Sequence, residues 1–196
     1  NQSFINNGVV LDKLFKALIV TPVEYNDLLL CDKNAVMIAA RILGYGKDYP
    51  IKAVNPTTGE DVEHVVDLTQ LPEKEIDWSL LDKGTNEFTL DLPAAKIPVK
   101  LKLLTQRDQS KMDAELKGLA KLKKNAAVST MMKYVITNID GETDNAKIRK
   151  FVDTRLLAID SRAIRKFLIS ITPETSLEVQ VPDGDSGDSF RATVSI

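Results

Sequence analysis

The chain has 196 residues, of which 43% are hydrophobic and 28% charged, a composition typical of globular proteins rather than of disordered or collagen-like chains. The length is about 1.3 times a typical domain of ~150 residues, so it allows one domain or two small ones. Apolar runs such as Leu28 to Cys31 are far shorter than the ~20 residues of a membrane-spanning helix, and no signal-peptide pattern opens the sequence. We therefore expect a protein that neither spans a membrane nor is secreted.

Two further features of the sequence concern the redox compartment of the protein and the start of the chain. The single cysteine, Cys31, allows no internal disulfide, which favours a reducing compartment. The chain opens on Asn1-Gln2-Ser3-Phe4, which reads like the middle of a protein, and we expect a segment to precede it.

Charge is distributed unevenly, although 26 basic and 28 acidic side chains nearly cancel to a net charge of −2. Residues 24–91 hold 14 acidic and 6 basic residues, a net charge of −8. Residues 96–124 hold 9 basic and 3 acidic residues, a net charge of +6. The charge therefore forms a dipole along the sequence, a pattern that can point to charged partners.

The hydrophobic pattern predicts helices at the start of the chain. Apolar residues recur at helical spacing over residues 8–19, and Thr21-Pro22 can cap and begin a second helix. Asp32 is a candidate N-cap of a third helix, which Gly44 and Gly46 end. The expected inward face of this third helix consists of Val36, Ile38, Ala39, Ile42 and Leu43.

Strands are predicted next. Residues 49–53 and 62–66 alternate in polarity around a turn at residues 55–59, which predicts a β-hairpin. After a proline- and acid-rich connection over residues 71–82, a second alternating pair follows at residues 88–92 and 97–103. Pro93 and Pro98 interrupt this pair, which favours edge strands.

The remaining chain is predicted to be helical up to a final hairpin. Thr105 is a candidate N-cap of a lysine-rich helix that runs to about Lys124. Shorter helices are expected over residues 128–139 and 145–157, and another that Asp160-Ser161 caps and that runs to Ser170. Residues 177–181 and 190–196 alternate again around a turn at residues 182–187.

The order helix, strand, turn and strand occurs twice along the chain. Each residue of the first occurrence matches the residue 128 positions later, and we name this separation of 128 residues the repeat offset. Residues matched at the repeat offset are Asp32 and Asp160, Ala35 and Ala163, Gly59 and Gly187, and Val66 and Val194. We interpret this agreement as an internal duplication. Two unrelated helix-then-hairpin units are the alternative.

Candidate chemical residues are few. His64 lies in a predicted strand near Asp61, Glu63 and Asp67, but no second histidine or cysteine completes a metal or acid–base site, so a packed histidine is favoured. Cys31 follows three leucines, which favours a buried structural thiol over a nucleophile.

Known catalytic motifs are also missing from the sequence. Gly44-Tyr45-Gly46 lacks the third glycine of a phosphate-binding loop and follows a predicted helix instead of a strand. Asp183, Asp185 and Asp188 resemble part of a calcium loop without its final glutamate, which favours a solvated turn. We therefore expect no catalytic residue, no metal site and no cofactor.

The basic segment offers a candidate partner-binding surface. No aromatic residue lies between Lys96 and Lys124 to stack on bases, so nucleic acid is an unlikely ligand for this helix. A solvated face, or a dock for an acidic protein, is favoured. The candidate binding residues are Lys111, Lys117, Lys121, Lys123 and Lys124.

Several segments resemble the baseplate hub proteins of T-even-like contractile-tailed phages, also described as hub assembly proteins or tail assembly chaperones. The first half does so through residues 32–35, residues 40–49 (Ala-Arg-Ile-Leu-Gly-Tyr-Gly-Lys-Asp-Tyr) and residues 66–71 (Val-Asp-Leu-Thr-Gln-Leu). The second half does so through Ile139-Asp140-Gly141 and residues 157–165. The resemblance covers nearly the whole chain.

The resemblance implies an α+β fold, a tandem repeat of helical-bundle and β-hairpin units. Residues 1–84 would form the first repeat, without its N-terminal part, and residues 85–196 a complete second repeat. Family members often hold zinc through cysteines at the hairpin turns, but residues 55–59 and 183–187 carry none, so the zinc-ribbon-like hairpins are degenerate here and we expect no bound zinc.

The implied function is that of a non-enzymatic structural protein of the phage baseplate or tail, located in the virion and assembled in the host cytoplasm. Its partners would be other baseplate, hub or tail proteins. An assembly chaperone absent from the mature virion is the alternative, and a nucleic-acid-binding regulator is a third, less favoured one.

Overall fold

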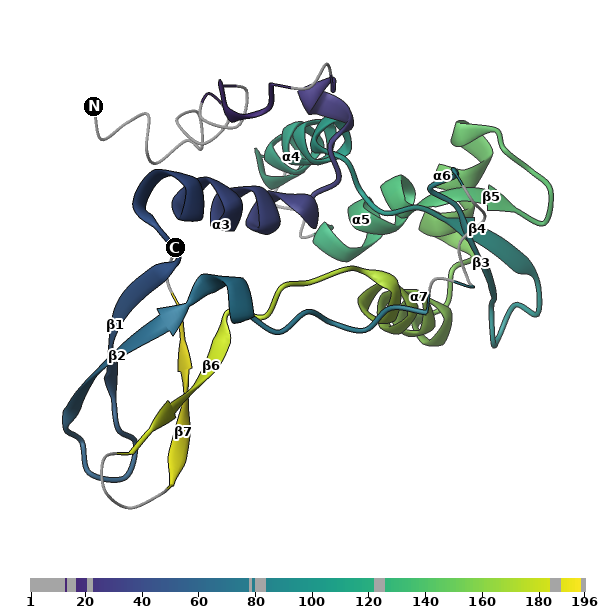
Figure 1. Cartoon of the computed structure of the whole chain (residues 1–196). Coiled ribbons are helices and arrows are strands. Elements are labelled where there is room, and N and C mark those ends of the chain that lie inside the picture. The colour runs from purple at the N-terminus through teal and green to yellow at the C-terminus, as the bar shows by residue number, and fades with distance from the viewer. Residues whose placement is uncertain are drawn as a thin grey trace. The chain divides into compact units, whose positions relative to one another are not determined.

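The computed structural model describes residues 13, 17–20, 23–77, 79, 84–121, 126–183 and 188–194. These residues form a mixed α+β protein with small antiparallel sheets, so the α+β class of the expected fold is confirmed (Figure 1). The helices are α3 (Asp32–Tyr45), α4 (Gln106–Lys121), α5 (Ala127–Val135), α6 (Asn145–Thr154) and α7 (Ala158–Ile171). No helix among the described residues is long and apolar enough to cross a membrane.

The chain divides into two compact units. Unit 1 is drawn from residues 1–20, 31–75 and 173–196, and unit 2 from residues 21–30 and 76–172. Each unit therefore takes residues from both sides of residue 84, so the compact units do not follow the predicted repeat boundaries. The division into repeats at residues 1–84 and 85–196 remains a prediction about sequence relationship.

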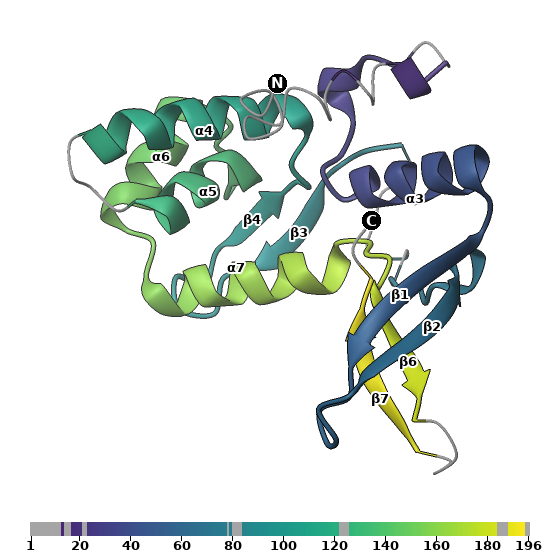
Figure 2. The same ribbon diagram turned by 90° about the vertical axis from the view of Figure 1, so that its left-hand side faces the viewer.

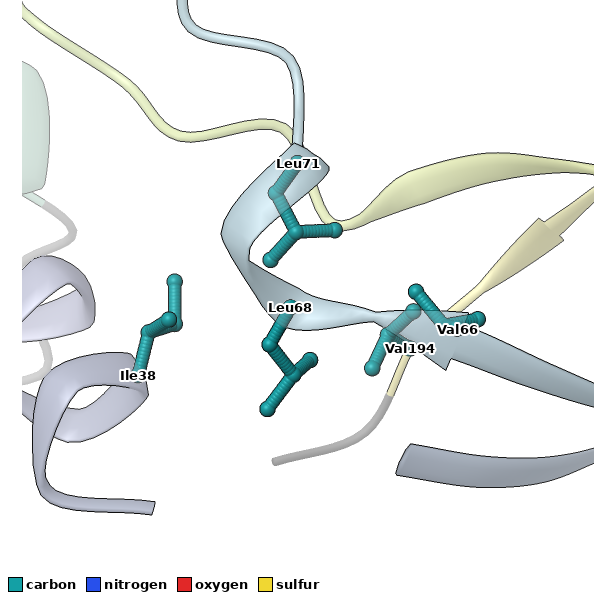
Figure 3. Packing of buried hydrophobic residues seen from close by; sticks show 5 residues of the cluster. All are labelled: Ile38, Val66, Leu68, Leu71 and Val194. Carbon is teal, nitrogen blue, oxygen red and sulfur yellow. The ribbon is translucent and has the colours of Figure 1, made fainter. Parts of the chain in front are cut away.

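Unit 1 is built from α3 and two β-hairpins. The first hairpin pairs β1 (Asp48–Val54) with β2 (Asp61–Asp67), and the second pairs β6 (Glu178–Pro182) with β7 (Ser189–Thr193). Both hairpins and α3 contribute to one core, together with the short 3-10 helix η2 (Leu68–Gln70) and the residue after it. The buried residues of this core are Ile38, Val66, Leu68, Leu71 and Val194 (Figure 3).

The two hairpins of unit 1 share one register. Every β6–β7 pair equals a β1–β2 pair shifted by the repeat offset; Ile51 opposite His64 corresponds to Val179 opposite Ala192. The same shift relates the backbone bond that closes each turn, from Asn55 N–H to Glu60 O at 2.8 Å and from Asp183 N–H to Asp188 O at 2.9 Å. Residues on the inner face of one hairpin thus have counterparts on the inner face of the other.

Unit 2 contains a three-stranded antiparallel sheet with the order β3 (Phe88–Asp91), β4 (Pro98–Leu101) and β5 (Ile136–Ile139). One face is apolar, because Phe88 pairs with Leu101 and Leu90 with Val99, while the alternate residues Thr89 and Lys100 are exposed. Figure 2 shows α7 running beside β3 and β4. The Phe88 and Phe167 rings meet edge to face, with centroids 6.5 Å apart.

The sheet of unit 2 corrects two predictions. β4 is the central strand, so the edge position predicted for it is wrong; Pro98 is its first residue, where a missing N–H is tolerated. The helix predicted over residues 128–139 ends at Val135, and residues 136–139 form β5. β-branched Ile136, Thr137 and Ile139 favour a strand, and pairing with β4 supplies its hydrogen bonds.

The beginning of the chain also differs from expectation. Most of the helix predicted over residues 8–19 lies outside the described residues. Beyond Thr21-Pro22 the structure has only the 3-10 turn η1 (Tyr25–Asp27), and the predicted second helix is wrong. Leu28 and Leu30 instead exchange backbone hydrogen bonds with Gln106 and Leu104, which draws this segment into extended pairing.

The predicted ends of the helices are confirmed in part. α3 ends at Tyr45, where Gly46 has a φ of 85°, and α4 begins directly after Thr105. The capping role predicted for Asp32 is wrong: Asp32 is the first helical residue and no side chain caps α3. Asp160 does not cap α7 either, because that helix begins at Ala158. Within α3, Ala39 and Leu43 are exposed rather than inward-facing.

Candidate partner-binding surface

The lysine-rich helix predicted to bind a partner is α4, and its start is fixed by reciprocal hydrogen bonds. The Thr105 N–H and hydroxyl donate to Asp108 Oδ2 at 3.1 and 3.0 Å, and the Asp108 N–H donates to Thr105 Oγ1 at 3.3 Å. This arrangement is a capping box, with aspartate in place of the usual glutamate. The Lys102 ammonium also donates to both carboxylate oxygens of Asp108 at 2.8 Å.

Opposing effects act on the Asp108 carboxyl group. Burial alone would raise its pKa, but hydrogen bonds from Lys102 and Thr105 outweigh that effect and hold the pKa below its usual value. The carboxylate therefore stays charged at neutral pH, close to the positive end of the α4 dipole, where a negative charge is stabilising.

The opposite side of α4 is fixed to α5 and α6. Half-buried Met112, Leu116 and Leu119 lie on this side. Beside them, Glu115 is ion-paired with Arg149 of α6 and accepts a hydrogen bond of 3.0 Å from the Tyr134 hydroxyl of α5. The Arg149 guanidinium lowers the pKa of Glu115 despite partial burial. These contacts determine which face of α4 is left exposed.

The exposed face of α4 carries the predicted lysines. Lys111, Lys117 and Lys121 are exposed, and no described carboxylate lies within 4.0 Å of their ammonium groups. Lys123 and Lys124 lie outside the described residues. Small exposed residues lie beside the lysines at Ser110, Ala114, Gly118 and Ala120, and Asp113 adds one exposed carboxylate, which accepts a hydrogen bond of 2.7 Å from the Gln109 side chain. The result is an open basic surface with few side chains that would obstruct a partner.

Arg107 extends this surface but is already engaged. Its guanidinium is ion-paired with Asp27 at 2.9 Å, and both side chains are at least half exposed. The sequence pattern did not single out Arg107, because its pairing partner lies 80 residues earlier in the chain. The available positive charge on α4 is therefore that of the three described lysines, offset in part by exposed Asp113.

The β1–β2 hairpin is the acidic counterpart expected from the charge pattern. Asp48, Glu60 and Glu63 are exposed. Part of the remaining charge is neutralised locally, because Lys47 pairs with Asp67 at 2.6 Å and Lys52 with Asp61 at 3.0 Å. The acidic surface is consequently weaker than the net charge of the sequence suggests.

His64 and Cys31 are the two residues that the sequence raised as candidates for chemistry. His64 is half-buried on β2 and lines an open cavity of about 480 Å³ in unit 1, together with Asp67, Glu178 and Arg191. Burial, reinforced by the neighbouring Asp32 carboxylate, raises the pKa of the Cys31 thiol to about 11. The thiol is thus protonated at neutral pH, and its environment does not favour a nucleophilic thiolate.

The turns that carry cysteines in zinc-ribbon-like proteins have a different chemistry here. The Asn55 side-chain oxygen accepts hydrogen bonds from the Thr57 and Thr58 N–H groups at 2.8 and 3.3 Å, which closes the first turn. Asp185, one of three aspartates in the second turn, lies outside the described residues. Across the part of the chain that is described, no three metal-ligating side chains form a group.

Comparison of the chain with protein-family models, curated proteins and solved structures gives no match.

Proposed function

We propose that this chain is a structural component of a phage baseplate or tail that contributes to hub assembly through protein–protein contacts and catalyses no reaction. The observation that carries the proposal is the exposed lysine face of α4, whose three described ammonium groups have no described carboxylate within ion-pair distance. Exposed Asp113 offsets part of this charge, and the remaining net positive charge on a fixed helix face steers an oppositely charged partner and sets its orientation. The proposed location is the virion, and the proposed partners are other baseplate, hub or tail proteins.

We also propose that the chain is a tandem repeat with zinc-ribbon-like hairpins that hold no zinc. The identical register of β1–β2 and β6–β7 at the repeat offset supports the duplication. Asn55 and the residues after it close their turn through side-chain hydrogen bonds, a structural substitute for a metal clip. Metal analysis of the purified chain is expected to find less than one equivalent of zinc; one equivalent would overturn this proposal.

Mass spectrometry of purified phage particles, compared with the infected-cell lysate, tests the proposed function. Peptides from this chain should persist through particle purification at a fixed, small number of copies. Abundance in the lysate with absence from particles would instead assign the chain to the assembly chaperones. The measurement separates the two because a chaperone leaves before the particle matures.

A further inference from the structure

The two hairpins of unit 1 meet through residues that are equivalent at the repeat offset. Val66 and Val194 are buried in the same cluster (Figure 3). Near the turns, the side chain of Asn55 contacts that of Asp183. The partly buried residues around the cluster include two more equivalent pairs, Tyr49 and Leu177, and Ile51 and Val179. Surfaces that meet their own equivalents are typical of the interface in a twofold-symmetric dimer. The hairpin pair therefore has the form of a dimer interface within one chain.

Asn55 and Asp183 break this symmetry, because they present different hydrogen-bonding groups at the same position of the contact. The Asn55 Oδ1 atom accepts from the Thr57 and Thr58 N–H groups at 2.8 and 3.3 Å, so it is directed toward its own turn. The Nδ2 group is directed toward the other hairpin and donates to Asp183 Oδ1 at 2.6 Å. A carboxylate is an acceptor only. The first hairpin thus presents a donor and the second hairpin an acceptor.

The donor and the acceptor match only when the two hairpins are unlike. Two first hairpins would bring two Nδ2 donors together, and two second hairpins would bring two carboxylates together. The mismatch would be buried, since Asn55 is 2% exposed, and a buried polar group without a partner is strongly unfavourable. Residues 55 and 183 therefore select the pairing of a first hairpin with a second one.

The connection that leads to the second hairpin consists of residues 172–177, between the end of α7 and the start of β6. Backbone hydrogen bonds hold it to the segment that follows the first hairpin. The Ser176 N–H donates to the Pro72 carbonyl at 2.8 Å, and the Lys74 N–H donates to the Glu174 carbonyl at 3.0 Å. Exchange of an identical element between two copies re-forms the contacts of the single chain, including these two bonds. A second copy can thus supply a β6–β7 hairpin that makes the same contacts.

We propose that unit 1 is a site where two copies of this chain associate, with the β6–β7 hairpin of each copy packed on the β1–β2 hairpin of the other. Residues 55 and 183 determine this pairing. The chain's own hairpin competes with that of the second copy and is favoured in dilute solution, because a linked hairpin has a high effective concentration. Association therefore increases with protein concentration, or when the contact within the chain is weakened. It involves only unit 1 and does not depend on the virion location.

Two complementary variants of the full chain test this exchange. Asn55→Asp places two carboxylates together within the chain, and Asp183→Asn replaces the charged acceptor by a weaker, neutral one. Exchange between copies of the same variant leaves its defect unchanged. Exchange between the two variants restores an amide facing a carboxylate at both contacts, because the altered hairpins meet each other and the unaltered Asn55 meets the unaltered Asp183.

The two variants, one of them labelled with ¹⁵N to distinguish their masses, are unfolded together, refolded at low micromolar concentration and observed by native mass spectrometry. The dimer with one copy of each variant is expected to be the most abundant dimer. It should exceed the Asn55→Asp homodimer at least about tenfold, because carboxylates without donors remain buried in that homodimer. The double variant Asn55→Asp with Asp183→Asn is matched within one chain and should dimerise no more than the parent.

Val65→Asp is the matched control. Val65 is 58% exposed on β2 and lies outside the cluster that joins the two hairpins, so this change adds the same charge to the first hairpin without altering the contact. Mixed with Asp183→Asn, it should give no enrichment of the mixed dimer. Statistical amounts of the three dimers in the test mixture, or equal enrichment in the control, would overturn the proposal. If Asn55→Asp alone does not fold, circular dichroism of the mixture decides: folding restored by the Asp183→Asn chain supports the exchange, and no restoration overturns it.

Discussion

The Asn55 side-chain amide donates a hydrogen bond of 2.6 Å to the carboxylate of Asp183, which lies 128 positions further along the chain. Asn55 precedes the turn of the first hairpin, and Asp183 occupies the equivalent position in the second. The contact therefore joins two positions that the proposed duplication makes equivalent. The two residues differ in chemistry, since a second aspartate in place of Asn55 would oppose Asp183.

Replacing Asn55 should destabilise unit 1. Asn55 is 2% exposed, and its side chain accepts from two backbone N–H groups and donates to Asp183. Asn55→Ala removes all three contacts and should cost about 2–3 kcal/mol in free energy of unfolding.

Asn55→Asp keeps the acceptor for the turn but places two carboxylates side by side, so it should recover stability when acid protonates one of them. Urea unfolding at pH 7 and pH 4 measures both effects; equal losses at both pH values for Asn55→Asp would contradict the role of charge.

Asp160 is expected to be far more important for stability than its counterpart Asp32. Asp160→Ala leaves the Ala94 and Ala95 N–H groups without their acceptor and should cost about 3 kcal/mol, since each hydrogen bond to a charged group contributes about 1.5 kcal/mol or more. Asp32→Ala removes a half-buried carboxylate from the first turn of α3, which loses a helix-dipole contribution of about 0.3–1 kcal/mol and the weak 3.7 Å hydrogen bond from the Cys31 thiol. Thermal unfolding of the two variants compares them directly, and similar losses would count against the assigned contact.

The sequence pattern predicts local structure better than long-range contacts in this chain. The helix stop at Gly46, the cap at Thr105 and both alternating hairpins follow from backbone and side-chain chemistry within a few residues. The pattern missed β5, because a strand of four residues after a helix shows no clear period and depends on β4 for its hydrogen bonds. The pattern also predicted Asp160 to be a cap. An aspartate near the start of a helix gives the same sequence signal whether its carboxylate binds its own helix or, as here, a turn 65 residues away.

The candidate surface was predictable for a different reason. Lys111, Lys117 and Lys121 stand out as a charge run in sequence, and the apolar residues between them turn toward α5 and α6, which leaves the lysines exposed. The exposed face of α3 was not predictable, because Ala39 and Leu43 follow the same spacing as buried residues.

Gly118→Ala should stabilise α4. Gly118 lies inside the helix, and a Cβ added there would meet no atom within 4 Å. Glycine is about 0.8–1.0 kcal/mol less favourable than alanine in a helix interior, so the free energy of unfolding should rise by about that amount. Urea unfolding with a circular-dichroism readout measures the change. A loss of stability would show that the small side chain at this position is needed for packing.

Stability should decrease at acidic pH through the carboxylates that hold α4. Asp108 and Glu115 both have pKa values lowered in the folded state, from the usual 3.8 and 4.5 respectively. Groups of this kind contribute their full stabilisation above their unfolded pKa and lose it as the pH falls through the folded value. The free energy of unfolding should therefore decline below about pH 4.5, as the unfolded state binds more protons.

The variant Asp108→Asn with Glu115→Gln tests this origin. It should be less stable than the parent at pH 7, because Lys102 and Arg149 lose their charged partners. Its stability should also depend less on pH between pH 5 and pH 3. A double variant with the same acid slope as the parent would assign the acid sensitivity to other carboxylates.

Reversing the charge of the basic α4 surface should weaken assembly while leaving the fold intact. Lys117→Glu and Lys121→Glu alter exposed residues whose ammonium groups have no described ion-pair partner, and Lys123→Glu extends the change along the predicted helix. Surface substitutions of this kind usually change stability by less than about 0.5 kcal/mol. The loss of attraction to an acidic partner should lower the yield of complete particles, and high salt should weaken the parent contact in the same way.

The triple reversal Lys150→Glu, Arg162→Glu and Lys166→Glu makes an equal change on exposed positions of α6 and α7 and should leave the yield unchanged. Unchanged particle yield in the α4 variant would argue against the surface, whereas salt-dependent DNA retention abolished by the same variant would favour the nucleic-acid-binding alternative.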